Sequence, residues 1–142
     1  MEAVLQKVNL LGFLQTQDGL QTQLLEKASN LSGGQCQRLV IARALLRTDS
    51  AVYIFDEAAS NIDVESEELI MNVIHELAKT KTVLLISHRL ANVVKSDKIY
   101  FLKDGEIKES GKHDELMRQN GAYRHLYESQ MALENYGKGG VA

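Results

Sequence analysis

The chain has 142 residues, a length typical of one domain, and a formal net charge of −3. Its composition, 44% hydrophobic and 25% charged, is that of a globular protein rather than a disordered or fibrous chain. The acidic balance and the absence of basic clusters argue against nucleic acid as a partner, because a protein that neutralises phosphates presents a basic face. The single cysteine, Cys36, excludes a disulfide framework. No apolar run reaches the roughly 20 residues of a membrane-spanning helix, and the first residues do not form a signal peptide.

The first third of the chain predicts two helices separated by a polar segment. Apolar side chains in residues 2–14 lie near helical spacing and predict an amphipathic helix that is interrupted or ends around Gly12. Residues 15–30 are polar and have little pattern. Residues 31–35 (LSGGQ) lead into a second helix, which is expected to end before Asp49.

Two short apolar runs predict neighbouring strands of a parallel sheet. Residues 51–55 (AVYIF) form an unbroken run of strand-forming residues, which is expected to be buried on both faces. Residues 82–86 (TVLLI) form a second such strand, and residues 64–79 between them have helical periodicity. The order strand, helix, strand predicts an α/β architecture.

A hairpin and helices are predicted for the remainder. Asp104 and Gly105 lie between two extended runs, residues 99–102 and 106–109, and an Asp-Gly pair in this position favours a hairpin turn. Residues 90–95 predict a short helix, and residues 113–133 predict two helices divided near residues 120–121. We therefore divide the single expected domain into a helical region (1–47), a core (48–136) and a frayed tail (137–142).

Residues 31–35 have the features of an anion site at a helix N-terminus. Ser32 can cap the following helix, and Gly33 and Gly34 allow a ligand to approach backbone N–H groups. The positive end of the helix dipole lies at the same place. A Ser-Gly-Gly run before a helix can also be an ordinary loop, so this segment alone does not identify a ligand.

Charged side chains follow both predicted strands, where open α/β sheets bind their ligands. Asp56 and Glu57 come directly after the first strand, and such a pair can hold Mg²⁺ and orient a water for attack on a phosphoryl group. His88 follows the second strand and could contact a phosphate. The alternatives are two solvated carboxylates and a structural histidine. Asp63 lies just past the acidic pair and before a helix, which it could simply cap.

The order of these elements resembles the ATP-binding-cassette (ABC) family. LSGGQ matches its signature motif, residues 51–56 its Walker B strand, Glu57 its catalytic glutamate, residues 60–63 its D-loop and His88 its switch histidine. The resemblance implies an ATP-hydrolysing domain with ATP and Mg²⁺ as cofactors. It also implies that Asp56 serves the metal, that Glu57 and His88 are catalytic, and that the nucleotide contacts Ser32, Gly33, Gly34, Gln35 and Asp63.

Other segments are similar to the exporter subgroup of this family. Residues 22–26 (TQLLE) look like its segment near the membrane domain, which places Glu26 at that contact, and residues 111–116 (GKHDEL) and 121–127 (GAYRHLY) resemble its C-terminal part. Leu25 and Ala28 replace glycines that are usual before the signature. The resemblance implies a second nucleotide-binding domain and a transmembrane domain as partners, at the cytoplasmic face of the cell membrane.

The sequence contains no G-x-x-x-x-G-K-[ST] run, which in this family supplies the backbone and lysine that hold ATP's phosphates. We therefore expect a truncated C-terminal part of a nucleotide-binding domain, inactive alone, whose LSGGQ acts on ATP held by a second subunit. That loop is expected to be exposed in the monomer, so that Gly34→Asp would leave the fold intact. Two alternatives stay open: a non-catalytic fragment that associates with an intact cassette domain, and a non-transport ABC ATPase.

Overall fold

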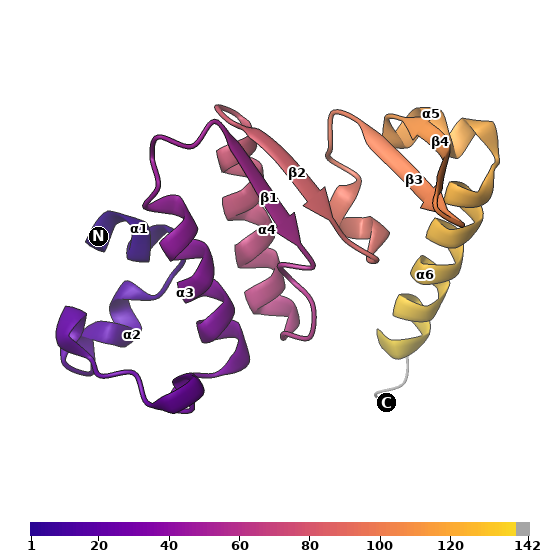
Figure 1. Ribbon diagram of the computed structural model, residues 1–142. Coiled ribbons are helices and arrows are strands. Elements are labelled where there is room, and N and C mark those ends of the chain that lie inside the picture. The colour runs from indigo at the N-terminus through magenta and orange to yellow at the C-terminus, as the bar shows by residue number, and fades with distance from the viewer. Residues whose placement is uncertain (139–142) are drawn as a thin grey trace. The chain divides into compact units, whose positions relative to one another are not determined.

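The computed structural model describes residues 1–138, which form two compact units divided between Ile86 and Ser87. Figure 1 follows the chain through both units from the N-terminus. Each unit is described by itself below. Within residues 1–138, every helix is too short or too polar to cross a lipid bilayer.

The N-terminal segment contains two short helices, α1 (Glu2–Lys7) and α2 (Leu11–Gln15), in place of the one predicted. The interruption lies at residues 8–10, where Asn9 adopts a left-handed backbone with φ of 52°. The prediction of a break at Gly12 is wrong, because Gly12 lies inside α2. The polar segment that follows contains two 3-10 turns, η1 (Gly19–Gln21) and η2 (Glu26–Ala28). Ala28 has a φ of 53° there, a conformation that glycine adopts more readily.

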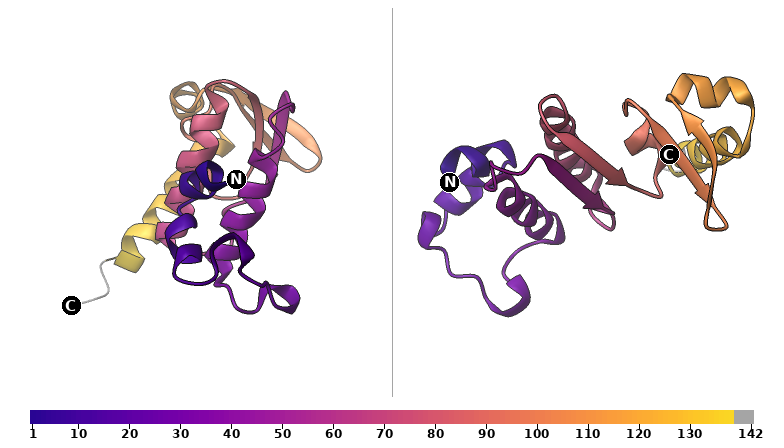
Figure 2. Two further views of the ribbon diagram at one scale, coloured as in Figure 1. Left: turned by 90° about the vertical axis from the view of Figure 1, so that its left-hand side faces the viewer. Right: turned by 45° about the horizontal axis from the view of Figure 1, so that its top comes forward.

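A parallel strand pair forms the centre of the first unit. Strand β1 (Val52–Asp56) pairs with β2 (Thr82–Ile86), with Ile54 opposite Leu84. Helix α3 (Gly33–Leu45) precedes β1, and α4 (Val64–Ala78) connects the two strands. The views of Figure 2 show the two strands side by side. The predicted strands, their parallel direction and the helix between them are confirmed.

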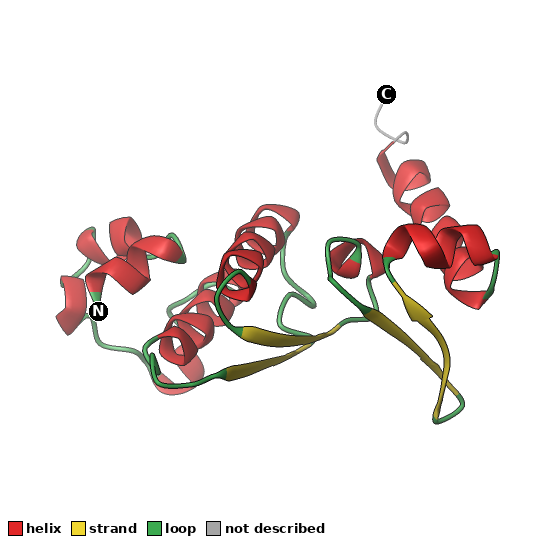
Figure 3. Cartoon of the chain, turned by 90° about the horizontal axis from the view of Figure 1, so that it is seen from above, coloured by secondary structure: helices red, strands yellow, loops and turns green. Residues whose placement is uncertain are grey.

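The helices of the first unit cover only one face of this sheet, as Figure 3 shows. Tyr53 and Phe55 are buried in the core that α1 to α4 form. On the opposite face, Val52 is 56% exposed, Ile54 65% and Leu84 49%. The prediction that residues 51–55 are buried on both faces is therefore wrong for the described chain, since no element of the first unit packs on the outer face.

The second unit begins with η3 (Leu90–Val93) and a hairpin of β3 (Ile99–Lys103) and β4 (Glu106–Gly111). Asp104 and Gly105 both have a left-handed backbone, with φ of 53° and 76°, as a type I′ turn requires. Helices α5 (His113–Gln119) and α6 (Ala122–Lys138) follow. Asn120 ends α5 in the left-handed conformation. The predicted hairpin turn and the division of the terminal helices are confirmed.

Tyr123 at the start of α6 is the centre of the second unit. Its side chain is fully buried, its ring meets that of Phe101 edge-on at 6.2 Å, and its hydroxyl lies 2.8 Å from Nδ1 of His113. Burial raises the pKa of Tyr123 to about 12. Of the tail predicted for residues 137–142, the first two residues belong to α6, and residues 139–142 lie outside the described part.

Candidate nucleotide site

The carboxyl ends of β1 and β2 lie side by side, and the acidic pair emerges there. Asp56, the last residue of β1, pairs with Ile86, the last residue of β2. The N–H of Glu57 donates to the carbonyl of Ile86 at 3.0 Å, which extends the pairing by one residue. Glu57 then turns with a left-handed φ of 51°, an uncommon conformation for a residue with a side chain. Asp56 is exposed and Glu57 is half-buried, and both residues lie at the carboxyl end of the strand pair.

The backbone that follows Glu57 is held in place by two side chains. Ser60 donates to the carbonyl of Glu57 from both its N–H (3.0 Å) and its hydroxyl (2.8 Å). Gln37 on α3 donates from Nε2 to the carbonyl of Ala58 at 2.7 Å. Sequence reasoning missed Gln37, although it lies four residues after Gly33 and so shares a helix face with the start of α3.

The donor set fits a magnesium ion that is shared with a nucleotide. Mg²⁺ is usually bound through one or two carboxylates together with phosphate oxygens and waters. Among residues 1–138 there is no group of three or more His, Cys, Asp or Glu side chains that could hold a metal alone. Asp56 could therefore supply one ligand, while the remaining ligands would come from the nucleotide and water.

Ser32 and Gln35 close the N-terminus of α3 as a capping box. The Ser32 hydroxyl accepts from the N–H of Gln35 at 3.1 Å, and Oε1 of Gln35 accepts from the N–H of Ser32 at 2.8 Å. Ser32 and Gly33 are exposed, and apart from the adjoining residues and the backbone of α3 itself no atom lies within 4 Å of the position that a Cβ on Gly33 would occupy. The predicted cap is confirmed, and the first turn of α3 is open to a ligand at Gly33.

Gly34 differs from Gly33 because it is buried against the start of α4. A Cβ on Gly34 would overlap Oγ of Ser66 and lie 2.8 Å from its Cβ. Asp63 caps α4 by accepting from the N–H of Ser66 at 2.8 Å, so the predicted cap is confirmed. This hydrogen bond holds the pKa of Asp63 below its usual range. The expectation that the whole loop is exposed is wrong at Gly34, where two helix N-termini meet with no space for a side chain.

We expect Gly34→Ala to lower the free energy of unfolding by about 1–3 kcal/mol, because the added methyl group overlaps Ser66. The matched control is Gly33→Ala, which adds the same methyl group into open space. Chemical denaturation of the two variants measures the difference. An equal stability for both would contradict the close packing of Gly34.

His88 and Glu26 are the remaining predicted site residues. His88 is exposed in the second unit, and its carbonyl accepts from Nε2 of Gln130 at 2.7 Å. Glu26 begins η2 and is exposed in the first unit. The roles assigned to both residues stay predictions.

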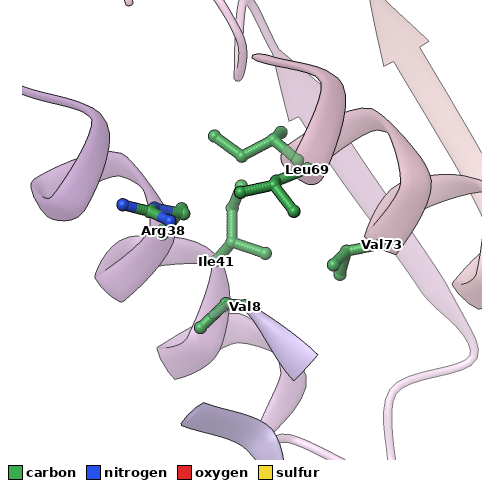
Figure 4. A pocket seen from close by; sticks show the side chains of 6 residues that line it. Val8, Arg38, Ile41, Leu69 and Val73 are labelled. Carbon is green, nitrogen blue, oxygen red and sulfur yellow. The ribbon is translucent and has the colours of Figure 1, made fainter. Parts of the chain in front are cut away.

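Figure 4 shows an apolar pocket on the helical side of the first unit. It leaves essentially no space for even a water molecule, whereas small-molecule sites begin at roughly 300 Å³. Arg38 is the one charged residue in its lining. Its lining residues are Val8, Arg38, Ile41, Leu69, Ile70 and Val73. We interpret it as a gap in helix packing that does not include the acidic pair at the carboxyl end of β1.

Comparisons with known proteins relate the chain to ATP-binding proteins of ABC transporters. A family model described as "ABC transporter" matches residues 1–60. An "Uncharacterized ABC transporter ATP-binding protein" of Haemophilus influenzae is 52% identical over 132 residues, which cover 93% of this chain and 23% of that protein. An "ATP-dependent lipid A-core flippase" of Mannheimia succiniciproducens is 52% identical over 114 residues, covering 80% and 19%. A solved structure of a bacterial Atm1-family ABC exporter with ATP bound matches 91% of this chain and 23% of its own, with a TM-score of 0.80 and 32% identity.

The chain is therefore similar to part of the ATP-binding domain of ABC exporters. It spans less than a quarter of the length of these relatives. The predicted resemblance to this family and the α/β fold class, with a small parallel sheet, flanking helices and a β-hairpin, are both confirmed.

Proposed function

We propose that this chain provides two different half-sites to a pair of ATP-binding domains. Asp56 and Glu57 serve the ATP bound by their own domain, and the first turn of α3 serves the ATP bound by the second domain. The observation that carries the proposal is that these features lie on different elements of the first unit. The carboxylates stand at the ends of β1 and β2, while Ser32 and Gly33 are exposed at a helix N-terminus.

Four of the predicted site residues have distinct roles in this proposal. Asp56 would hold Mg²⁺, and the ion would neutralise part of the negative charge of the phosphates. Glu57 orients the attacking water and accepts its proton. His88 contacts the terminal phosphate as charge develops on it. Asp63, as the cap of α4, holds the loop that reaches the partner's nucleotide.

The start of α3 recognises phosphate through backbone groups and the helix dipole. The Ser32 hydroxyl accepts from Gln35 and still has its own proton to donate. Gly33 allows an oxygen to approach the backbone without meeting a side chain. In this proposal Gly34 and Gln35 support the turn from inside, by packing on Ser66 and by completing the capping box.

We further propose that hydrolysis at these sites is coupled to transport. The exposed Glu26 contacts a transmembrane domain, and the chain works at the cytoplasmic face of the membrane through that domain. The exporter relatives support this assignment. A second candidate is a non-catalytic chain that only pairs with an intact ATP-binding domain.

The two candidates are separated with a hybrid protein in which this chain replaces the matching segment of the Haemophilus influenzae relative. The hybrid and the parent protein are assayed for ATP hydrolysis side by side. We expect the hybrid to retain hydrolysis within about tenfold of the parent, because every proposed catalytic group of this segment is present. A folded hybrid that binds ATP without hydrolysing it would contradict the proposal and support the second candidate.

For the 142-residue chain alone, we expect no steady ATP hydrolysis and only weak binding of Mg·ATP. The reason is that Asp56 and Glu57 reach a phosphate only if another segment supplies the backbone nest and lysine that hold it. A phosphate-release assay measures turnover, with Glu57→Gln as the control for a contaminating ATPase. Turnover by the chain that this substitution abolishes would contradict the expectation.

A further inference from the structure

The backbone of the segment that contains His88 is bound by a side chain of α6, Gln130. Nε2 of Gln130 donates to the carbonyl of His88 at 2.7 Å, and the N–H of Leu90 donates to Oε1 of Gln130 at 2.9 Å. A carbonyl can only accept and an N–H can only donate, so these two partners fix which way the side-chain amide faces. Gln130 therefore bridges the peptide groups on both sides of Arg89.

A second contact lies one helical turn further along α6. Nη2 of Arg89 lies 3.1 Å from Oε1 of Glu134, and Glu134 shares a helix face with Gln130 because the two are four residues apart. Both charged side chains are more than a third exposed, so this ion pair contributes at most about 1 kcal/mol. The ion pair also holds residues 88–90 against α6, but the amide of Gln130 provides the directional contacts.

The helix that carries Gln130 is itself firmly placed in the second unit. Tyr123 is fully buried, meets Phe101 of β3 edge-on, and has its hydroxyl 2.8 Å from Nδ1 of His113 on α5. The carboxylate of Glu109 accepts from the N–H of Ala122 and so caps the start of α6. Gln130 follows Tyr123 by about two turns, so its position is set by this aromatic packing.

We infer that Gln130 is a positioning residue that sets the backbone at His88 and thereby the direction from which the imidazole reaches a phosphate. This inference rests on the role proposed above for His88. Both contacts are to the backbone, so they orient the residue without engaging its ring. Ser87 completes the turn locally, because its hydroxyl accepts from the N–H of Arg89 at 3.1 Å.

The bridge itself is tested in the 142-residue chain. Gln130→Met keeps the length of the side chain and removes both hydrogen bonds, and Gln119→Met is the matched control at the exposed end of α5. Amide hydrogen exchange is followed at Leu90, with the thermal midpoint measured on the same samples. We expect exchange at Leu90 to become about tenfold faster in Gln130→Met only. Unchanged exchange at Leu90 would overturn the inference.

Whether the two hydrogen bonds of Gln130 matter for catalysis is tested in the hybrid protein described above. We expect Gln130→Met to lower kcat by about tenfold with KM near its original value, since a misplaced group affects the reacting state more than binding. His88→Ala reports on the proposed function by itself. If Gln130 acts through His88, the double variant is no slower than His88→Ala alone.

Each outcome of this comparison of single and double variants leads to a different conclusion. A kcat of Gln130→Met equal to that of the unsubstituted hybrid overturns the inference and leaves the proposed function intact. Fold-losses that multiply in the double variant also overturn it, because Gln130 would then act elsewhere. An unchanged kcat in His88→Ala contradicts the proposed role of His88 and, with it, any catalytic use of the bridge.

Discussion

Glu57→Gln, placed in the hybrid protein, is expected to lower ATP turnover by about 10²–10⁴-fold while nucleotide binding stays close to its original level. Glutamine has nearly the same shape as glutamate but cannot accept the proton of the attacking water. The loop should keep its conformation, because the N–H and carbonyl of Glu57 hold it through Ile86 and Ser60. Single-turnover hydrolysis and equilibrium binding of ATP measure the two effects separately.

Asp56→Asn is the matched comparison for this prediction. Asp56 is assigned to the metal, so its loss should weaken the Mg²⁺-dependent part of nucleotide binding as well as turnover. Binding is therefore measured for both variants with and without Mg²⁺. An equal loss of affinity in the two variants would remove the distinction between a metal ligand and a water-orienting base.

Gly33→Asp is expected to abolish turnover of the hybrid without lowering its stability. A carboxylate about 4 Å from a phosphate, at an effective dielectric near 20, is repelled by about 4 kcal/mol, more than the roughly 1 kcal/mol of attraction at a helix N-terminus. The same negative charge at the first turn of α3 favours the helix, and the space around Gly33 is open. Gly34→Asp cannot serve this purpose, because Ser66 occupies the space that its side chain needs.

A mixing experiment tests whether Gly33 acts on the nucleotide of the other subunit. Gly33→Asp and Glu57→Gln subunits are each expected to be inactive alone. In a mixed pair, one site combines the intact Gly33 of one subunit with the intact Glu57 of the other, so turnover should return. If Gly33 instead served the nucleotide of its own subunit, both sites would be damaged and the mixture would stay inactive.

Local patterns in the sequence predicted the elements that depend on neighbouring residues. The hairpin turn at residues 104–105, the Ser32 cap and the Asp63 cap are all determined within a few residues, and each is confirmed. The acidic pair was predictable because a buried strand leads directly into it. The predicted break at Gly12 failed because the left-handed turn at Asn9 interrupts the helix earlier.

The features that sequence reasoning missed depend on contacts between distant segments. Gly34 has no side chain, and its burial follows from the approach of Ser66, 32 positions later (66 − 34). Gln37 and Gln130 resemble ordinary polar residues of a helix surface, and only the fold brings Ala58 and His88 to them. The outer face of β1 and β2 was misjudged because an apolar sequence does not show which element packs against it.

The two strand pairs of this chain differ in how far apart their partners are in sequence, which affects the order of folding. Ile54 pairs with Leu84 across 30 positions (84 − 54), whereas Lys103 pairs with Glu106 across three (106 − 103). Loop-closure entropy grows with the logarithm of loop length, so the parallel pair costs roughly 2 kcal/mol more to close. Because non-local pairing slows folding, the hairpin and the helices packed on it have the kinetic advantage. The segment around His88 can thus become ordered on α6 before the parallel strand pair that carries Asp56 and Glu57 has formed.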